Sequence, residues 1–360
     1  MYLKKLKLTN YRNYFDLDFE FVSPITMLIG NNAQGKSNFL ESIYFLSTTK
    51  SLKAEKDEEL VKEGENFVRA EGIVEENETE ETNLEIGMQF VDGSMSKRVK
   101  INGLSKRVLD YIGNMPAVLF APEDINLVTD SPSLRRWHVD MTLAQIDREY
   151  KVALTNYGEV VTRRNKVLKG IQEGIAKIDE LTFWTDRLLE FGQTVTQKRK
   201  EFFEFINQTK EKFGNYRYEY QESLFNRERL QEYQSREIAS ATTLIGPHRD
   251  DFLFLLDSRD LSKYGSRGEI RTAVLDLKIS EVDFIEQKKG KRPILLLDDV
   301  FSELDLTHRE HVLDLCFKQQ TIITAVELDD HLQVFFEENG QILEVKQGIV
   351  NLFSETEQTT

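Results

Sequence analysis

Alternating apolar and polar side chains dominate the first third of the chain and predict a β-rich beginning. Residues 1–30 fit a small β-meander that leads into a buried apolar strand at Pro24–Ile29. Val68–Val74 and Leu84–Phe90 alternate in the same way, which predicts a pair of antiparallel strands. Ala117–Phe120 is apolar throughout, as expected for a strand that is buried on both faces.

A different pattern begins near Leu134 and continues to Arg236. Apolar residues recur there at three- and four-residue steps among charged ones, most clearly over Tyr150–Lys169 and Leu181–Phe213. One such stripe, which we expect to pack in a helical core, consists of Trp184, Leu188, Phe191 and Val195. The pattern predicts a helical insertion at residues 131–236.

An α/β pattern returns after this segment. Strands are predicted at Ala239–Ile245, Asp251–Leu256, Pro293–Leu297 and Thr321–Ala325. Helices are predicted at Ile270–Ile285 and Thr307–Phe317, and a small hairpin near the end of the sequence. The predicted fold class is α/β: residues 1–130 and 237–360 form one discontinuous domain, a mixed sheet with an antiparallel β-subdomain, which carries the inserted α-helical lobe at 131–236.

Length and composition limit the possible functions. The 360 residues suffice for about two domains. The net charge of −15 argues against general nucleic-acid binding, although a local basic face remains compatible with it. Cys316 is the single cysteine, which excludes thiolate metal clusters and fits a reducing cytoplasm. No apolar run approaches the roughly 18–20 residues of a membrane span.

The stretch from Gly30 to Ser37 reads G-x-x-x-x-G-K-S, the spacing of a phosphate-binding P-loop. It lies between an apolar strand and a segment with helical spacing, so backbone N–H groups and a helix N-terminus should face an anion. Lys36 is expected to reach the β- and γ-phosphates and thereby assist catalysis, and the Ser37 hydroxyl to bind Mg²⁺. The residues expected to contact the nucleotide are Gly30, Asn31, Asn32, Ala33, Gln34, Gly35, Lys36, Ser37 and Asn38.

A second part of the nucleotide site is predicted at Pro293–Asp299, an apolar strand that ends in two carboxylates. Such a pair lies at the sheet edge where α/β proteins bind ligands, which is the Walker B arrangement. Asp298 is expected to hold Mg²⁺, and Asp299 to orient or deprotonate the attacking water as the catalytic residue. The alternative is a strand that ends in an acidic turn; the P-loop in the same chain favours the metal site.

Two further segments resemble ABC-type ATPases. Leu261–Glu269 resembles their signature motif, and Ser302-Glu303-Leu304-Asp305 resembles their D-loop. The resemblance implies that Ser266 and Gly268 contact the γ-phosphate of ATP bound by an opposite subunit. It therefore implies that residues 1–130 and 237–360 form an ABC-type ATPase domain, the head. It also implies a head-to-head homodimer with two nucleotides between the subunits.

The order of motifs is similar to that of the RecF family of bacterial recombination-repair ATPases over nearly the whole chain. The segments that carry this resemblance are Met1–Tyr14, Gly30–Asn38 with Leu40–Ser47, Phe120–Val128, Ser131–Arg136 with Asp140, Arg163–Lys169, Gly246–Asp251 and Leu295–Asp305. The resemblance implies ATP and Mg²⁺ as cofactors and an ATP-dependent dimer that binds DNA at gaps and at junctions of single- and double-stranded DNA. It also implies partnership with RecR and RecO in loading RecA, and DNA release on hydrolysis.

Individual residues follow from the same resemblance. Arg12 and Asn32 match positions near the nucleotide, and Glu123 matches a Q-loop-like position beside the γ-phosphate or Mg²⁺. As in that family, the strand at Thr321–Thr324 carries no switch histidine, which implies slow turnover. The chain departs from the family pattern at Trp137-His138-Val139 and at Glu269.

Two basic clusters are candidates for DNA contact, although each also fits a solvated surface. They are Lys97, Arg98, Lys100, Lys106 and Arg107, and Arg163, Arg164, Lys166 and Lys169. The nucleotide-binding subunit of a membrane transporter is the alternative function, because it shares every nucleotide motif. A chromosome-organising protein with long coiled-coil arms is disfavoured, because about a hundred inserted residues at ~1.5 Å each cannot build such arms.

Overall fold

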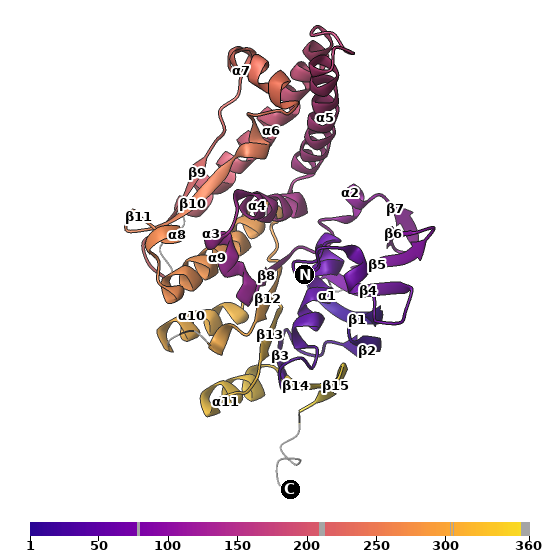
Figure 1. Ribbon diagram of the computed structural model, residues 1–360. Helices are drawn as coiled ribbons and strands as arrows, with labels where there is room; N and C mark the ends of the chain where they lie inside the picture. The colour runs from indigo at the N-terminus through magenta and orange to yellow at the C-terminus, as the bar shows by residue number, and fades with distance from the viewer. Residues whose placement is uncertain (78–79, 209–212, 303, 305, 354–360) are drawn as a thin grey trace. The chain divides into compact units, whose positions relative to one another are not determined.

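The computed structural model describes residues 1–77, 80–208, 213–302, 304 and 306–353, and its elements are labelled in Figure 1. The chain divides into two compact units. The first unit combines Met1–Asp124 with Glu281–Thr360, and the second is Ile125–Ser280. Each unit has its own buried hydrophobic cluster.

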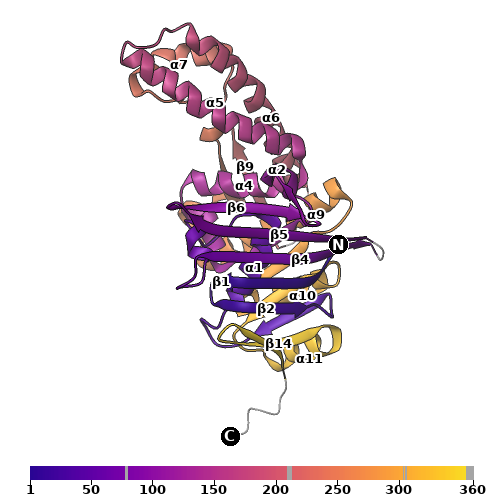
Figure 2. The same cartoon turned by 90° about the vertical axis from the view of Figure 1, so that its right-hand side faces the viewer.

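An antiparallel sheet of six strands forms one layer of the first unit, and its strands are seen side by side in Figure 2. Period-two alternation directs Leu6 and Leu8 into the core and leaves Lys7 exposed. In spatial order the strands are β2 (Tyr14–Glu20), β1 (Tyr2–Tyr11), β4 (Phe67–Asn77), β5 (Glu80–Val91), β6 (Ser94–Ile101) and β7 (Leu104–Lys106).

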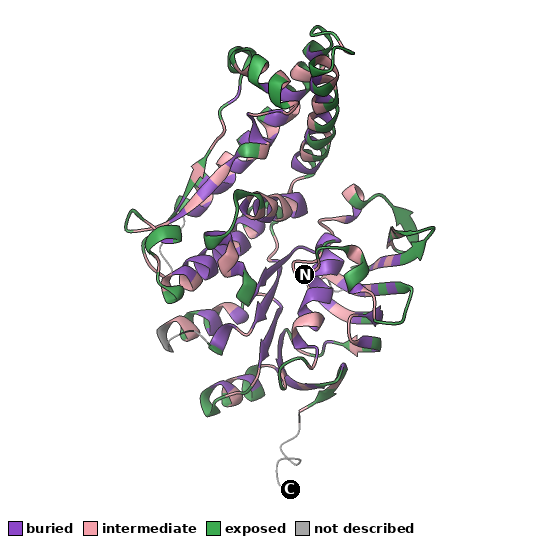
Figure 3. Ribbon diagram, in the orientation of Figure 1, coloured by how far each residue is buried: buried purple, intermediate pink, exposed green. Residues whose placement is uncertain are grey.

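A second sheet carries the predicted nucleotide motifs. Its order is β15 (Ile349–Leu352), β14 (Gln341–Lys346), β3 (Ile25–Ile29), β13 (Thr321–Ala325), β12 (Ile294–Asp298) and β8 (Ala117–Phe120). All neighbours except β15 and β14 run parallel, and β12 and β13 are buried along their whole length (Figure 3). Parallel strands place their carboxyl ends at one edge, so the ends of β3, β12 and β13 meet there.

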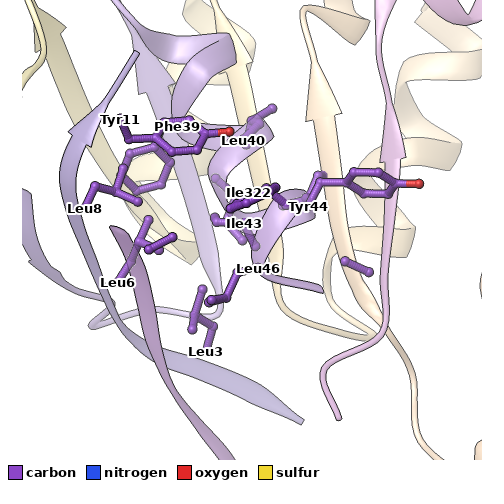
Figure 4. Close-up of a cluster of buried hydrophobic side chains, with 14 of the residues drawn as sticks. Leu3, Leu6, Leu8, Tyr11, Phe39, Leu40, Ile43, Tyr44, Leu46 and Ile322 are labelled. Carbon is purple, nitrogen blue, oxygen red and sulfur yellow. The ribbon is translucent and has the colours of Figure 1, made fainter. Parts of the chain in front are cut away.

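Helix α1 (Lys36–Thr48) packs against both sheets of the first unit. Its residues Phe39, Ile43 and Leu46 lie among side chains from β1 and β13 (Figure 4). This cluster fixes the helix that follows the predicted P-loop. The remaining helices of the unit are α2 (Val108–Tyr111), α10 (Leu306–Cys316) and α11 (Asp330–Asn339), with short 3₁₀ turns at Asp57–Leu60, Pro122–Ile125 and Val300–Ser302.

The second unit is mainly helical. Two helices, α5 (Arg148–Gln172) and α6 (Glu180–Gln208), form a long antiparallel pair that packs on Leu188, Tyr157 and Phe225. The other elements are α3 (Asn126–Thr129), α4 (Pro132–Ile146), β9 (Tyr216–Gln221), α7 (Arg227–Ser240), a 3₁₀ turn at Pro247–Arg249, β10 (Asp251–Leu256), β11 (Arg259–Asp260), α8 (Leu261–Tyr264) and α9 (Arg267–Lys289), whose end belongs to the first unit.

The predicted α/β class with a helical insertion is confirmed, and most predicted elements are present. The strand predicted at Ala239–Ile245 is wrong: α7 continues to Ser240, and Ala241 adopts a left-handed conformation with φ of 51°. The backbone after it bonds to side chains, with Thr243 N–H donating to Asn165 and Leu244 N–H to Glu237. These side chains accept the backbone hydrogen bonds that a neighbouring strand would otherwise accept.

Three further differences concern elements rather than class. The initial meander comprises only β1 and β2, because β3 belongs to the other sheet. Strand β9 and helix α11 were not predicted. The compact unit 125–280 is larger than the predicted insertion at 131–236, since β9 inside the insertion pairs with β10 beyond it. The functional assignment of 237–280 to the ATPase domain stays a prediction.

Candidate nucleotide-binding site

The predicted P-loop connects β3 to α1 in the first unit. Gly30 and Gly35 adopt φ angles of 143° and 120°, a region that favours glycine. A Cβ on Gly30 would lie 2.5 Å from the carbonyl oxygen of Val345, and one on Gly35 would lie 2.4 Å from Nδ2 of Asn13. Both glycines are therefore required by backbone conformation and by close packing.

Lys36 is buried at the first position of α1, and its side chain folds back across the loop. The ammonium group donates to the carbonyl oxygens of Gly30 and Asn31, at 2.6 and 2.9 Å. Burial lowers the pKa of Lys36, and attraction to Asp298 and Asp299 opposes that shift. Because its hydrogen-bond acceptors Gly30 and Asn31 are neutral carbonyl groups, the ammonium group is placed to exchange them for charged phosphate oxygens.

Ser37, Asp298 and Thr324 meet at the carboxyl ends of β12 and β13. The Ser37 hydroxyl donates to Asp298 Oδ1 at 2.8 Å, and the Thr324 hydroxyl donates to the same oxygen at 2.7 Å. Neighbouring ligands of an octahedral Mg²⁺ lie ~2.9 Å apart, since each bond is about 2.0–2.1 Å long. The two oxygens of Ser37 and Asp298 therefore fit the predicted Mg²⁺ site, where the ion would neutralise phosphate charge.

Asp299 follows directly with a φ of 53°, which is unusual for a residue with a side chain. Its N–H donates to the Thr324 hydroxyl at 3.0 Å, so one threonine holds the backbone of Asp299 and the carboxylate of Asp298. Strained backbone of this kind is common at active sites, where surrounding bonds maintain it. Thr324 thus holds the left-handed backbone of Asp299 in place, and the catalytic role of Asp299 stays a prediction.

Lys53 is a site residue that the sequence pattern did not reveal. Its ammonium lies 3.2 Å from Asp298 Oδ2 and 3.3 Å from Glu123 Oε1. Burial lowers the pKa of Lys53, but the combined attraction of Asp298 and Glu123 outweighs burial, and the net pKa is raised. Glu123, predicted from the Q-loop-like segment, is therefore joined to the predicted Mg²⁺ ligand through this lysine.

Arg12 lies in the turn between β1 and β2, as predicted, and adopts a φ of 51°. Its guanidinium donates twice to the buried carboxylate of Glu41 on α1, at 3.0 and 2.9 Å, and once to the carbonyl of Glu59 at 2.8 Å. Burial lowers the pKa of Arg12, and the bonds to Glu41 more than offset it, so the net pKa is raised. Contact of Arg12 with a nucleotide stays a prediction.

A polar cavity of about 610 Å³ borders the P-loop at Gly30, Asn31 and Gln34. Its other walls come from residues 326–328, which follow β13, and from α11, β14 and Phe353. Asn31, Asn32 and Ala33 form the exposed crest of the loop, whereas Asn38 lies within the first turn of α1.

Ser266 and Gly268 belong to the second unit. Both are exposed at the beginning of α9, where Ser266 and Glu269 form a reciprocal cap: Ser266 N–H donates to Glu269, and Glu269 N–H donates to Ser266. Their contact with ATP of another subunit stays a prediction. Of the predicted D-loop, Glu303 and Asp305 lie outside the described residues.

None of the helices in the described part of the chain is long and apolar enough to cross a membrane.

Comparison with known families and relatives gives consistent results. The model of the RecF/RecN/SMC N-terminal domain matches residues 2–350. The DNA replication and repair protein RecF of Agathobacter rectalis is 36% identical over 367 residues, covering 99% of this chain and 100% of that protein. RecF of Halalkalibacterium halodurans is also 36% identical, with 97% of this chain and 98% of that protein covered.

Solved structures agree with these relatives. The recombination mediator protein RecF with ATP, described as part of the RecFOR pathway, superposes with a TM-score of 0.89 at 32% identity. The alignment covers 98% of each chain. An SMC head bound to the C-terminal winged-helix domain of ScpA superposes with a TM-score of 0.52 at 14% identity, which supports the fold alone.

Proposed function

Because the chain belongs to the RecF family of DNA replication and repair proteins, we propose that it is an ATP-driven clamp on DNA. ATP with Mg²⁺ closes two copies head to head, and the closed homodimer holds DNA at gaps and at junctions of single- and double-stranded DNA. Slow, DNA-dependent hydrolysis reopens the dimer and releases the DNA. With RecR and RecO, the clamp assists the loading of RecA.

One observation carries this proposal. A single chain supplies the P-loop, the Ser37–Asp298 pair and Asp299, and also exposes Ser266 and Gly268 at the start of α9. In ABC-type ATPases, the first set binds the nucleotide in one subunit and the second set completes the site of the other. The presence of both sets supports a dimer in which each subunit contributes to two sites.

The basic side chains narrow the choice of DNA contacts. Five of the nine candidates have carboxylate partners: Lys97 binds Asp57, Lys100 binds Glu85, Arg107 binds Asp110, Arg164 binds Glu237, and Lys169 lies 3.8 Å from Glu173. Their positive charge is largely balanced, which weakens them as phosphate ligands. Arg98, Lys106, Arg163 and Lys166 are exposed, and we assign phosphate contact to these four.

The decisive test uses Ser266→Arg, which places a bulky cation on the exposed signature segment and leaves the P-loop unchanged. Binding of fluorescent gapped duplex is measured by anisotropy without nucleotide, with ADP and with ATP. The variant should bind ATP normally as a monomer and lose ATP-dependent retention of DNA.

Ser235→Arg is the matched control, because Ser235 is also an exposed serine of the second unit but lies outside the signature segment Leu261–Glu269. It should retain DNA in the presence of ATP. If Ser266→Arg forms ATP-dependent complexes as well as this control does, closure through the signature segment is wrong.

A further inference from the structure

Two consecutive residues at the β1–β2 turn, Asn13 and Tyr14, form hydrogen bonds to the P-loop. Asn13 donates from Nδ2 to the carbonyl oxygen of Gln34 at 2.9 Å and accepts from the Asn38 side chain at 2.8 Å. Tyr14 donates from its hydroxyl to the carbonyl oxygen of Gly35 at 3.0 Å. The side chain of Asn13 therefore connects the loop to the first turn of α1.

A second support comes from the hairpin between β14 and β15, far away in the sequence. Gly348 N–H donates to the carbonyl oxygen of Gln34 at 3.0 Å, and Gln347 N–H donates to the Gln34 side chain at 2.8 Å. The Gln34 carbonyl consequently accepts two hydrogen bonds, one from Asn13 and one from Gly348. Two donors on one carbonyl oxygen fix the direction in which it points.

That direction determines where the next N–H group points. A trans peptide is planar, with its C=O and N–H on opposite sides, so fixing the Gln34 carbonyl also fixes the N–H of Gly35. The Gly35 carbonyl is likewise held by the Tyr14 hydroxyl and by the N–H of Phe39, at 3.0 and 2.9 Å, which fixes the N–H of Lys36. Backbone N–H groups at these positions of a P-loop cradle phosphates.

Glycine at position 35 makes this support necessary. Without a Cβ the residue can adopt many conformations, so the loop needs external contacts to hold one of them. Asn13 occupies the space that a Cβ on Gly35 would take, since that atom would lie 2.4 Å from Asn13 Nδ2. The Asn13 side chain can therefore pack against Gly35 only because residue 35 has no Cβ.

We propose that Asn13 is a positioning residue for the phosphate site: it holds the Gln34–Gly35 peptide with the Gly35 N–H turned toward the phosphates before a nucleotide arrives. The inference rests on the proposed nucleotide site but not on dimerisation or DNA binding. Asn13 acts through the peptide of Gln34 and does not touch the phosphates.

The test is the affinity of Asn13→Ala for fluorescent ATP and ADP analogues in the presence of Mg²⁺. Loss of the bond should raise both dissociation constants about tenfold, because both nucleotides use the same loop amides. The KM for hydrolysis should rise with kcat at saturating ATP unchanged, since the loop is ordered once occupied. Hydrogen exchange of the 30–38 segment in the nucleotide-free variant should accelerate, with an unchanged melting temperature.

Lys62→Met is the matched control, because Lys62 donates to the backbone carbonyl of Asn13 and not to the loop. It should bind both nucleotides as the unmodified protein does. Asn13→Asp provides a second variant of equal size: it keeps the acceptor for Asn38 but places a carboxylate oxygen against the Gln34 carbonyl. Its affinity should fall at least as far as that of Asn13→Ala.

The proposal is overturned if both Asn13 variants bind nucleotide with unmodified affinity, or if Lys62→Met shows the same loss. A result in which kcat alone falls also overturns it, because a positioning role in the empty loop affects binding. Nucleotide titration gives this answer even if the protein never dimerises, so failure of the clamp and failure of this inference are distinguishable.

Discussion

Replacing Arg164 should destabilise the helical unit more than any change to an exposed basic residue nearby. Arg164 and Glu237 are both almost fully buried, and their side chains bond at 2.6 Å. Arg164 also donates to the Thr243 hydroxyl at 2.9 Å, and Glu237 accepts from the Leu244 N–H at 2.9 Å. Removal of one partner from such a pair leaves a buried charge without compensation.

Arg164→Met should therefore lower the free energy of unfolding by about 3–5 kcal/mol. Adding Glu237→Gln removes the stranded charge while keeping an acceptor for Leu244. The double variant should recover most of the loss and lie within about 1–2 kcal/mol of the unmodified protein. Arg163→Met, one residue earlier, loses only an exposed guanidinium located 5.9 Å from the Trp184 ring, which should cost below about 1 kcal/mol.

Urea unfolding followed by tryptophan fluorescence measures these differences. The chain has two tryptophans, Trp137 and Trp184, and both lie within residues 125–280, so the signal reports the second unit. The reasoning is refuted if Arg164→Met and Arg163→Met unfold at the same urea concentration. It is also refuted if the double variant is no more stable than Arg164→Met alone.

Two further predictions concern titration and metal binding. Burial lowers the pKa of His248 to about 4. Between this value and the ordinary histidine pKa of about 6.5, the unfolded chain takes up a proton at His248 while the native state stays neutral. The stability of the protein therefore falls as the pH falls through this window. His248→Gln should abolish about 2 kcal/mol of the stability lost between pH 7 and pH 5 in urea titrations; equal losses in both proteins would contradict the assignment. Lys53→Met should leave the Asp298 carboxylate without its ammonium partner. Mg²⁺ added with ATP should then raise the melting temperature of the variant more than that of the unmodified protein. Identical shifts would show that Lys53 does not compete with Mg²⁺ for Asp298.

Motifs formed by neighbouring residues could be predicted from the sequence. The P-loop needs a strand, two glycines at fixed spacing and a helix, all within Pro24–Leu46, and each of these is present in the structure. The acidic pair at the end of β12 was recognisable for the same reason. Asp298 and Asp299 follow directly on an apolar strand, and the carboxyl end of such a strand lies at the sheet edge where ligands bind.

Residues that act across the sheet could not be found in this way. Lys53, Thr324 and Asn13 carry no local signature, and their roles arise only when distant segments meet at the ends of β3, β12 and β13. In the sequence, Thr324 is one of many threonines that favour a β-strand. Its role becomes visible only in the register of β12 and β13, which places Thr324 beside Asp298.

The missed elements have different causes. Strand β9 reads Tyr-Arg-Tyr-Glu-Tyr-Gln from Tyr216, a period-two signal that the surrounding helical pattern concealed. Helix α11 begins at the capping residue Asp329, whose side chain accepts from the Leu332 N–H, but its apolar stripe is short. The residues at 241–245 have strand propensity that side-chain hydrogen bonds from α5 and α7 override.

The most direct test of the clamp is the mass of the protein in solution, measured by light scattering during gel filtration. One chain has a mass of 42.0 kDa. With saturating ATP and Mg²⁺ the mass should double, and it should stay near that of one chain with ADP; Asp299→Asn should prolong the doubled state by slowing hydrolysis. A mass that is the same with ATP and with ADP, in protein shown to have bound ATP, would contradict the account.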